Sequence, residues 1–220
     1  MELMEVAVKS TPRRYDASGR RAQAERSRAS IIDAARELFL DVGYAATTIA
    51  SIGARAGVSV ETIYKAFGGK PGLVRAICAQ ALAGSGPVPA EQRSDDLQRN
   101  ETDPRVIIRG WGALTVEVAP RIVPLLLLVR AAATHDPAMA DLQVEMDDSR
   151  LERMTRNTTS LVEPGHLRRG LTTIAAAEIL WTYSSPEMYE LLVLRRGWTV
   201  ERYSGFITEA MIAALVPGND

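Results

Sequence analysis

Helical spacing of apolar residues constrains the fold of this 220-residue chain more than any other feature, because it runs through most of the sequence. Asp103-Pro104 and Asp136-Pro137 each place a capping side chain before a proline, which is typical of a helix start. Gly43 and Gly57 follow periodic segments and predict helix ends. No segment alternates strongly enough to be predicted as a β-strand, so we expect an all-α fold.

The charge of the chain changes along its length. Residues 1–82 contain 12 Lys/Arg and 8 Asp/Glu, whereas the remainder contains 14 and 19. The segment 84–103 lies where the balance changes, and its polar residues and helix breakers predict a loop. We therefore expect a flexible basic arm (1–24), a small helical domain (25–83), this loop, and a larger helical domain (104–217).

Several function classes are not expected from the composition. A nucleophile–base pair, paired carboxylates, a phosphate loop and metal-ligand spacing are all missing, so we expect no enzyme, cofactor or metal site. The single cysteine, Cys78, suits a reducing cytoplasm and is expected to be a small buried residue. The aliphatic run at 122–129 is shorter than the roughly 20 residues of a membrane span, so no membrane is expected.

The segment 47–70 has the pattern of two short helices joined by a tight turn. The turn is Ala56–Ser59, after which Val58, Ile63 and Phe67 are expected to point inward. The outward positions of the second short helix are Val60, Glu61, Thr62 and Lys65. A DNA major groove admits one such helix while the preceding helix braces it, as in a helix-turn-helix. The pattern alone fits an ordinary helical core segment equally well.

The sequence "TTIASIGARAGVSVETIYKAFGGKPGLVRAI" closely resembles the DNA-binding domain of the TetR family of bacterial regulators. The shared features are Thr48 before an Ile-x-x-Ile pair, the Ala-Gly-Val-Ser turn, Ile63-Tyr64, Phe67 and Lys70, together with the preceding "AARELFLDVGY". The resemblance covers roughly residues 25–82. It implies a helix-turn-helix domain followed by a helical domain that binds an effector and dimerises.

The resemblance also assigns roles to residues. It implies that Thr48, Tyr64 and Lys70 touch phosphates of double-stranded DNA. It implies that base edges or the adjacent backbone are faced by Val60, Glu61, Thr62 and Lys65. Ser59, at the start of the same helix, and Arg28 also belong to the expected DNA-binding set. Glu61 can accept from a cytosine amino group or simply favour the helix dipole. Gly53 replaces the usual alanine, which is expected to loosen its helix by up to ~1 kcal/mol.

The basic arm has two interpretations. Its cations Arg20, Arg21, Arg26 and Arg28 can reach a neighbouring groove or the DNA backbone, as arms of other helix-turn-helix proteins do. Alternatively, the arm is a solvated disordered tail.

The larger domain is expected to hold an effector pocket, lined by apolar side chains with a few polar ones. Pro120 is expected to break the helix that starts at 104, and residues 121–133 to form a buried helix. The candidate lining residues are Trp111, Leu114, Val118, Leu126, Met139, Leu142, Met146 and Trp181, with Arg130, His135 and Glu178 as polar candidates. For each apolar residue the alternative is ordinary core. The expected effector is a small apolar or amphipathic molecule.

The helices at 172–184 and 199–216 are apolar on more than one face, so one face can pack against a second subunit. The TetR resemblance implies a homodimer with a four-helix interface built from them. Candidate interface residues are Ala176, Ala177, Leu180, Phe206, Ala210 and Ala214. The expected function is a ligand-responsive repressor that binds a palindromic operator as a dimer. The alternative is a helical scaffold or interaction protein without specific DNA binding.

Overall fold

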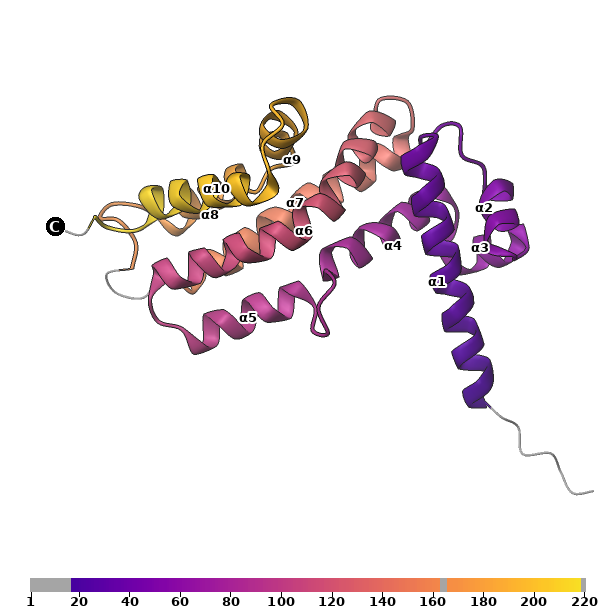
Figure 1. Ribbon diagram of the computed structural model, residues 1–220, viewed down its shortest axis with the longest axis horizontal. Helices are drawn as coiled ribbons and strands as arrows, with labels where there is room; N and C mark the ends of the chain where they lie inside the picture. The colour runs from indigo at the N-terminus through magenta and orange to yellow at the C-terminus, as the bar shows by residue number, and fades with distance from the viewer. Residues whose placement is uncertain (1–16, 163–165, 219–220) are drawn as a thin grey trace, which may run out of the picture.

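A computed structural model describes residues 17–162 and 166–218, and it consists of helices and connecting turns, with no strand in these ranges (Figure 1). The elements are α1 (Ala17–Asp41), α2 (Ile49–Ala56), α3 (Val60–Phe67), α4 (Lys70–Ala83), α5 (Ala90–Asn100), α6 (Pro104–Ala133), α7 (Pro137–Thr159), α8 (Thr173–Tyr183), α9 (Pro186–Tyr189), the π-helical segment η1 (Glu190–Arg195) and α10 (Val200–Leu215). The expected all-α fold class is confirmed.

The helices form two groups that α4 connects. α1, α2 and α3 pack together at one end of the molecule, and α4 leads from them to α6 and α7 (Figure 1). α6, α7, α8 and α10 pack against one another in the second group. Buried apolar side chains run from Ile31 and Ile63 through Leu73 to Ile107 as one continuous core. A change in the second group can therefore reach the first through packed side chains.

α6 does not end at Pro120. It continues for 30 residues with Pro120 and Pro124 inside it, which contradicts the expected break. Buried side chains on both sides, such as Ala119 and Ile122, contribute the packing energy that offsets a proline cost of ~3 kcal/mol. α6 is long and apolar enough to cross a membrane, but in this fold it packs against α4, α5, α7 and α10.

The segment 84–103 is not a loop throughout, because residues 90–100 form α5. Its sequence "AEQRSDDLQRN" has few apolar residues, so periodicity gave no helix there. It is rich in the helix formers Ala, Glu, Gln and Arg. Polar contacts to α7 and the packing of Leu97 against α6 hold this helix in place of a wide apolar stripe.

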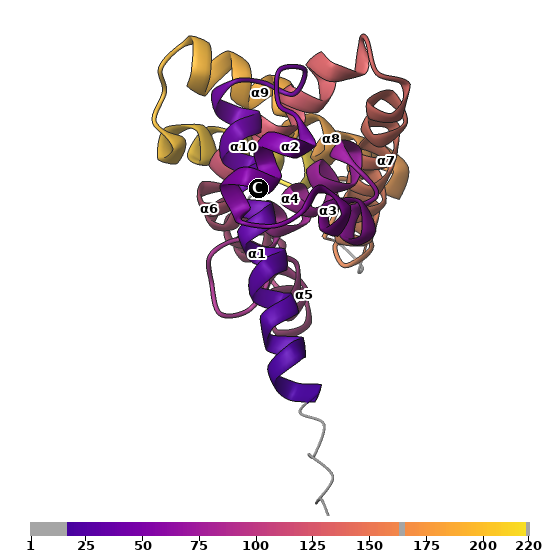
Figure 2. The same cartoon turned by 90° about the vertical axis from the view of Figure 1, so that its right-hand side faces the viewer.

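The expected flexible arm is also partly helical. α1 begins at Ala17, so residues 17–24 belong to a 25-residue helix that projects from the body of the molecule (Figures 1 and 2). Alanine, arginine and glutamine favour the helix without burial, and Arg21 pairs with Glu25 one turn on. The cations Lys9, Arg13 and Arg14 of the expected arm lie outside the described residues.

Candidate functional site

Side-chain caps fix both short helices of the helix-turn-helix. Thr48 caps α2 by accepting from the backbone N–H of Ser51 at 3.0 Å, and Ser51 accepts from the N–H of Thr48 in return. Gly57 ends α2 in the left-handed conformation at φ 70°. Ser59 then caps α3 by accepting from the N–H of Thr62 at 3.2 Å. Thr48 and Ser59, both expected at the DNA, therefore stand exposed at helix N-termini, where backbone dipoles favour anions.

Gly53 allows the close approach of α2 to the turn. A Cβ at this position would lie 2.9 Å from the carbonyl oxygen of Val58, which is backbone and cannot turn aside. The N–H of Val58 donates to the carbonyl of Gly53 at 3.0 Å. The glycine therefore has a packing role in addition to its expected cost in helix propensity.

The outward face of α3 is exposed as the sequence predicts. Ile63 is fully buried, and Val58 and Phe67 are half-buried against the core. Val60 and Tyr64 are 42% and 53% exposed, large values for apolar and aromatic side chains. The polar members of this face, Glu61, Thr62 and Lys65, are exposed as well.

Lys70, which was expected to touch a DNA phosphate, is bonded to backbone carbonyls of its own chain. Its ammonium donates to the carbonyl oxygens of Tyr44 at 2.6 Å and Thr47 at 3.0 Å, and it lies 4.1 Å from the centre of the Tyr44 ring. Burial lowers the pKa of Lys70, and nearby Asp136 opposes that shift. Two of its three N–H donors are thus used within the protein, and they fix the loop between α1 and α2.

The helix-turn-helix is joined to the second group by two polar contacts that the sequence did not suggest. The Tyr44 hydroxyl donates to the carboxylate of Asp136 at 2.8 Å, and Asp136 also caps α7. Arg75 of α4 pairs with Glu145 of α7 through two hydrogen bonds of 3.0 and 2.5 Å. Burial, then the bond to Asp136, raises the pKa of Tyr44, and that bond lowers the pKa of Asp136. The start of α7 is therefore tied directly to the end of the molecule that holds the helix-turn-helix.

Three of the candidate pocket residues line one small cavity. A cavity of about 30 Å³, enough for one or two water molecules, brings together Leu126, Arg130 and Met146 of the candidate set. Arg130 is held by ion pairs of 3.1 Å to Glu187 and 2.6 Å to Glu190. A drug-sized ligand needs roughly 300 Å³ or more, so binding here requires the helices to move.

Other pocket candidates are divided between core and surface. Met139 and Leu142 are fully buried and Trp111 is nearly so, while Leu114 and Val118 are half-buried. Glu178 and His135 are exposed on the surface, so neither faces an interior pocket. The half-buried Trp181 is stacked by the guanidinium of Arg150 at 4.2 Å. Among the described residues, the buried indole N–H groups of Trp111 and Trp181 have no hydrogen-bond partner.

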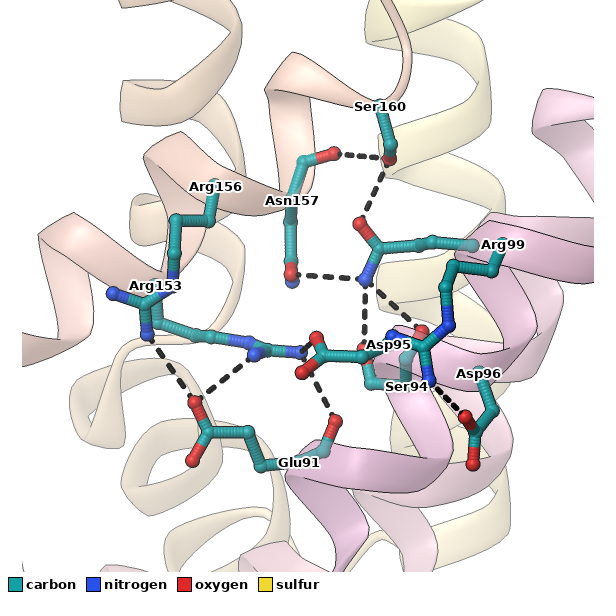
Figure 3. A network of polar contacts seen from close by, with 10 residues as sticks. Glu91, Ser94, Asp95, Asp96, Arg99, Arg153, Arg156, Asn157 and Ser160 are labelled. Carbon is teal, nitrogen blue, oxygen red and sulfur yellow. Dashed lines mark hydrogen bonds and ion pairs between the residues drawn. The ribbon is translucent and has the colours of Figure 1, made fainter.

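A polar network holds α5 against α7 (Figure 3). Arg153 of α7 bridges Glu91 at 3.0 Å and Asp95 at 2.7 Å. Gln98 donates to Asn157 at 3.3 Å and accepts from Ser160 at 2.8 Å. Ala90 and Ser94 of α5 are fully buried and Leu97 packs against the core, so packing against α6 and these polar contacts together attach α5.

The expected dimer residues fall into two groups. Ala176, Ala177 and Leu180 are buried within their own subunit, so they cannot form an interface. α8 is apolar on more than one face, so the sequence could not indicate which of these faces packs inward. Phe206 is 44% exposed, and Ala210 and Ala214 are half-buried. The outward face of α8 instead carries Ile174, which is 73% exposed.

Comparisons with known proteins agree with this geometry. Residues 31–77 match the family described as "Bacterial regulatory proteins, tetR family". The chain is 40% identical over 83 residues to the HTH-type transcriptional regulator BetI 1 of Chromohalobacter salexigens. That match covers 38% of this chain and 41% of the relative, so it spans well under half of the curated relative's length.

Solved structures share the fold over most of the chain. The SmeT–triclosan complex is 21% identical with a TM-score of 0.70, covering 88% of this chain and 93% of that one. A transcriptional regulator from Saccharomonospora viridis in complex with choline is 18% identical with a TM-score of 0.65, covering 88% and 100%. At these identities the likeness establishes the fold alone.

Proposed function

Through its N-terminal domain the chain belongs to the tetR family of bacterial regulatory proteins, and from that premise we propose that it is a ligand-responsive transcriptional repressor in the cytoplasm. The observation that carries the proposal is the exposed outward face of α3, which follows a capped, glycine-containing turn. Val60 and Tyr64 give this face two large side chains, 42% and 53% exposed, that a DNA surface can cover.

We propose that α3 enters the DNA major groove. Val60, Glu61, Thr62 and Lys65 then face base edges or the adjacent backbone. Thr48 and Ser59, at the N-termini of α2 and α3, meet phosphates together with the Tyr64 hydroxyl and the third N–H of Lys70. Phosphate contacts position the protein, and the α3 face supplies sequence preference.

We further propose a homodimer through the exposed faces of α8 and α10. These helices pack together in one subunit, and each leaves a large apolar side chain outward, Ile174 and Phe206. A second copy covering both would remove them from water. The two α3 helices would then lie about 34–36 Å apart, which matches a palindromic operator.

The effector is proposed to be a small apolar or amphipathic molecule bound among α6, α7 and α9. Two proteins of this fold were solved with small organic molecules, triclosan and choline, and the largely apolar triclosan is of that kind. Since the cavity beside Leu126 and Arg130 is only about 30 Å³, the effector must favour a more open arrangement. Asp136, the partner of Tyr44, caps the start of α7, so a displacement of α7 would move the DNA-binding end.

Selection of bound fragments from the source genome tests this function. The bound DNA is sequenced, and the affinity of each fragment is titrated against salt. Fragments sharing an inverted repeat, bound in the nanomolar range with a steep salt dependence, support the repressor. Weak binding that ignores sequence would overturn it and favour a helical scaffold or interaction protein.

A Tyr64→Ala variant serves as the comparator in this experiment. Loss of the side chain should weaken binding to every fragment by a similar factor, because a phosphate contact carries no sequence information. An unchanged affinity would show that α3 docks in another way.

A further inference from the structure

The first 14 residues of α1 extend beyond the folded core. The buried core of the chain begins at Ile31, whereas α1 begins at Ala17. At 1.5 Å per residue this N-terminal extension, residues 17–30, reaches about 20 Å past the core. Both views show the indigo end of α1 projecting away from the other helices (Figures 1 and 2).

The extension is strongly basic. It carries Arg20, Arg21, Arg26 and Arg28 against one acid, Glu25, and all five side chains are exposed. The ion pair of Arg21 with Glu25 is between exposed groups at 3.3 Å, and such a pair yields readily to a competing phosphate. The extension has no apolar stripe to bury, so packing within the chain does not explain why it projects.

The base of the extension is attached to the helix proposed to enter the groove. The guanidinium of Arg28 lies 4.5 Å from the centre of the Phe67 ring and donates to the carbonyl of Ala66 at 3.5 Å. Phe67 is the last residue of α3. Arg28 therefore attaches the base of the extension to the C-terminal end of α3.

We propose that the extension is a second DNA-binding element, which lies along the phosphate backbone flanking the site read by α3. This inference rests on the proposed function. Duplex DNA carries one negative charge per ≈1.7 Å of its axis, so a helix of about 20 Å spans several phosphates. Because the arm is already helical, binding avoids much of the ordering cost that a flexible tail incurs. The element adds affinity and operator length rather than base preference.

The test replaces Arg20, Arg21 and Arg26 together by glutamine, which favours a helix and removes the charge. The slope of log affinity against log salt should become shallower by about 2 or more, since a dimer loses at least one contact per subunit at ≈0.9 each. The affinity is also measured on DNA probes that are shortened step by step from both ends. The wild type should lose affinity before the shortening reaches the site that α3 reads. The triple variant should show no such flank dependence. Circular dichroism verifies that the helix content is kept.

A matched control replaces the exposed Arg99, Arg109 and Arg169 of the second helical group by glutamine. This variant has the same change in net charge and should keep the wild-type salt slope and flank dependence. Equal slopes and flank dependence for the triple variant and the wild type would overturn the inference while leaving the repressor intact. If the wild type binds no fragment specifically, the proposed function itself fails and the inference falls with it.

Discussion

Lys70 shows how a single side chain can organise the DNA-binding end from within. Its ammonium satisfies the carbonyls of Tyr44 and Thr47, residues that are themselves buried. Lys70→Ala leaves both carbonyls without that donor, so we expect a loss of about 1–2 kcal/mol of unfolding free energy after allowing for partial solvent access. Urea denaturation measures it. Lys65→Ala, on the exposed face of α3, should stay within about 0.5 kcal/mol of the wild type, and an equal effect of both substitutions would refute the assigned role.

Gly53 gives a second prediction at the same scale. Gly53→Ala gains about 1 kcal/mol of helix propensity, but its Cβ would meet the Val58 carbonyl at 2.9 Å. Overpacking against backbone typically costs about 1–3 kcal/mol, so we expect a net loss of stability and of DNA affinity. Thermal denaturation and a DNA titration measure these effects. A variant more stable than the wild type would mean that the turn relaxes freely.

At the scale of elements, Glu117 of α6 holds the connection from α4 to α5. Its carboxylate accepts from the backbone N–H groups of Ser85 and Gly86 and pairs with Arg93 at 2.7 Å. These bonds, with that from Ser85 first, lower the pKa of Glu117 to about 2. The contribution to stability is complete above about pH 4.5 and disappears as the pH falls toward 2.

Glu117→Gln removes this dependence on pH. The difference in urea midpoint between wild type and variant should be constant from pH 7 to pH 5 and should narrow between pH 4.5 and pH 3. The same difference at pH 3 as at pH 7 would show that the carboxylate is not held in this way.

Elements that neighbouring residues in the sequence determine were predictable, whereas elements that depend on contacts with distant helices were not. The caps at Asp103 and Asp136 and the turn at Gly57 follow from residues adjacent in sequence, and each forms as expected. α5 and the uninterrupted α6 depend on contacts with distant helices, which override the local effect of polar residues and of Pro120. The outward face of α3 was predictable because a helix of eight residues has one apolar side.

The remaining parts of the candidate site depend on which faces meet in three dimensions. Sequence placed Lys70 near DNA but could not show that two carbonyls compete for its ammonium. It likewise offered Ala176 and Leu180 for a dimer face, although α10 and α7 cover that side of α8. The Tyr44–Asp136 bond joins residues 92 positions apart and had no local pattern at all.

At the scale of the whole molecule, the proposed dimer makes a direct prediction. Ile174→Asp places a charge on the most exposed apolar position of α8, so the protein should sediment as a monomer and lose at least tenfold in DNA affinity. Val144→Asp is a matched control on α7, because Val144 is 61% exposed and lies outside the proposed face. Sedimentation velocity measures both. A dimer that survives Ile174→Asp and Phe206→Asp would place the interface elsewhere.

Hydroxyl-radical footprinting on a selected genomic fragment tests the central claim most directly, since it reports where and how often the protein meets the backbone. The account predicts two protected patches whose centres lie about one helical turn, 34–36 Å, apart and are related by the inverted repeat. Tyr64→Ala should weaken both patches equally. A single patch, or protection without relation to a repeat, would contradict a dimer that reads DNA through α3.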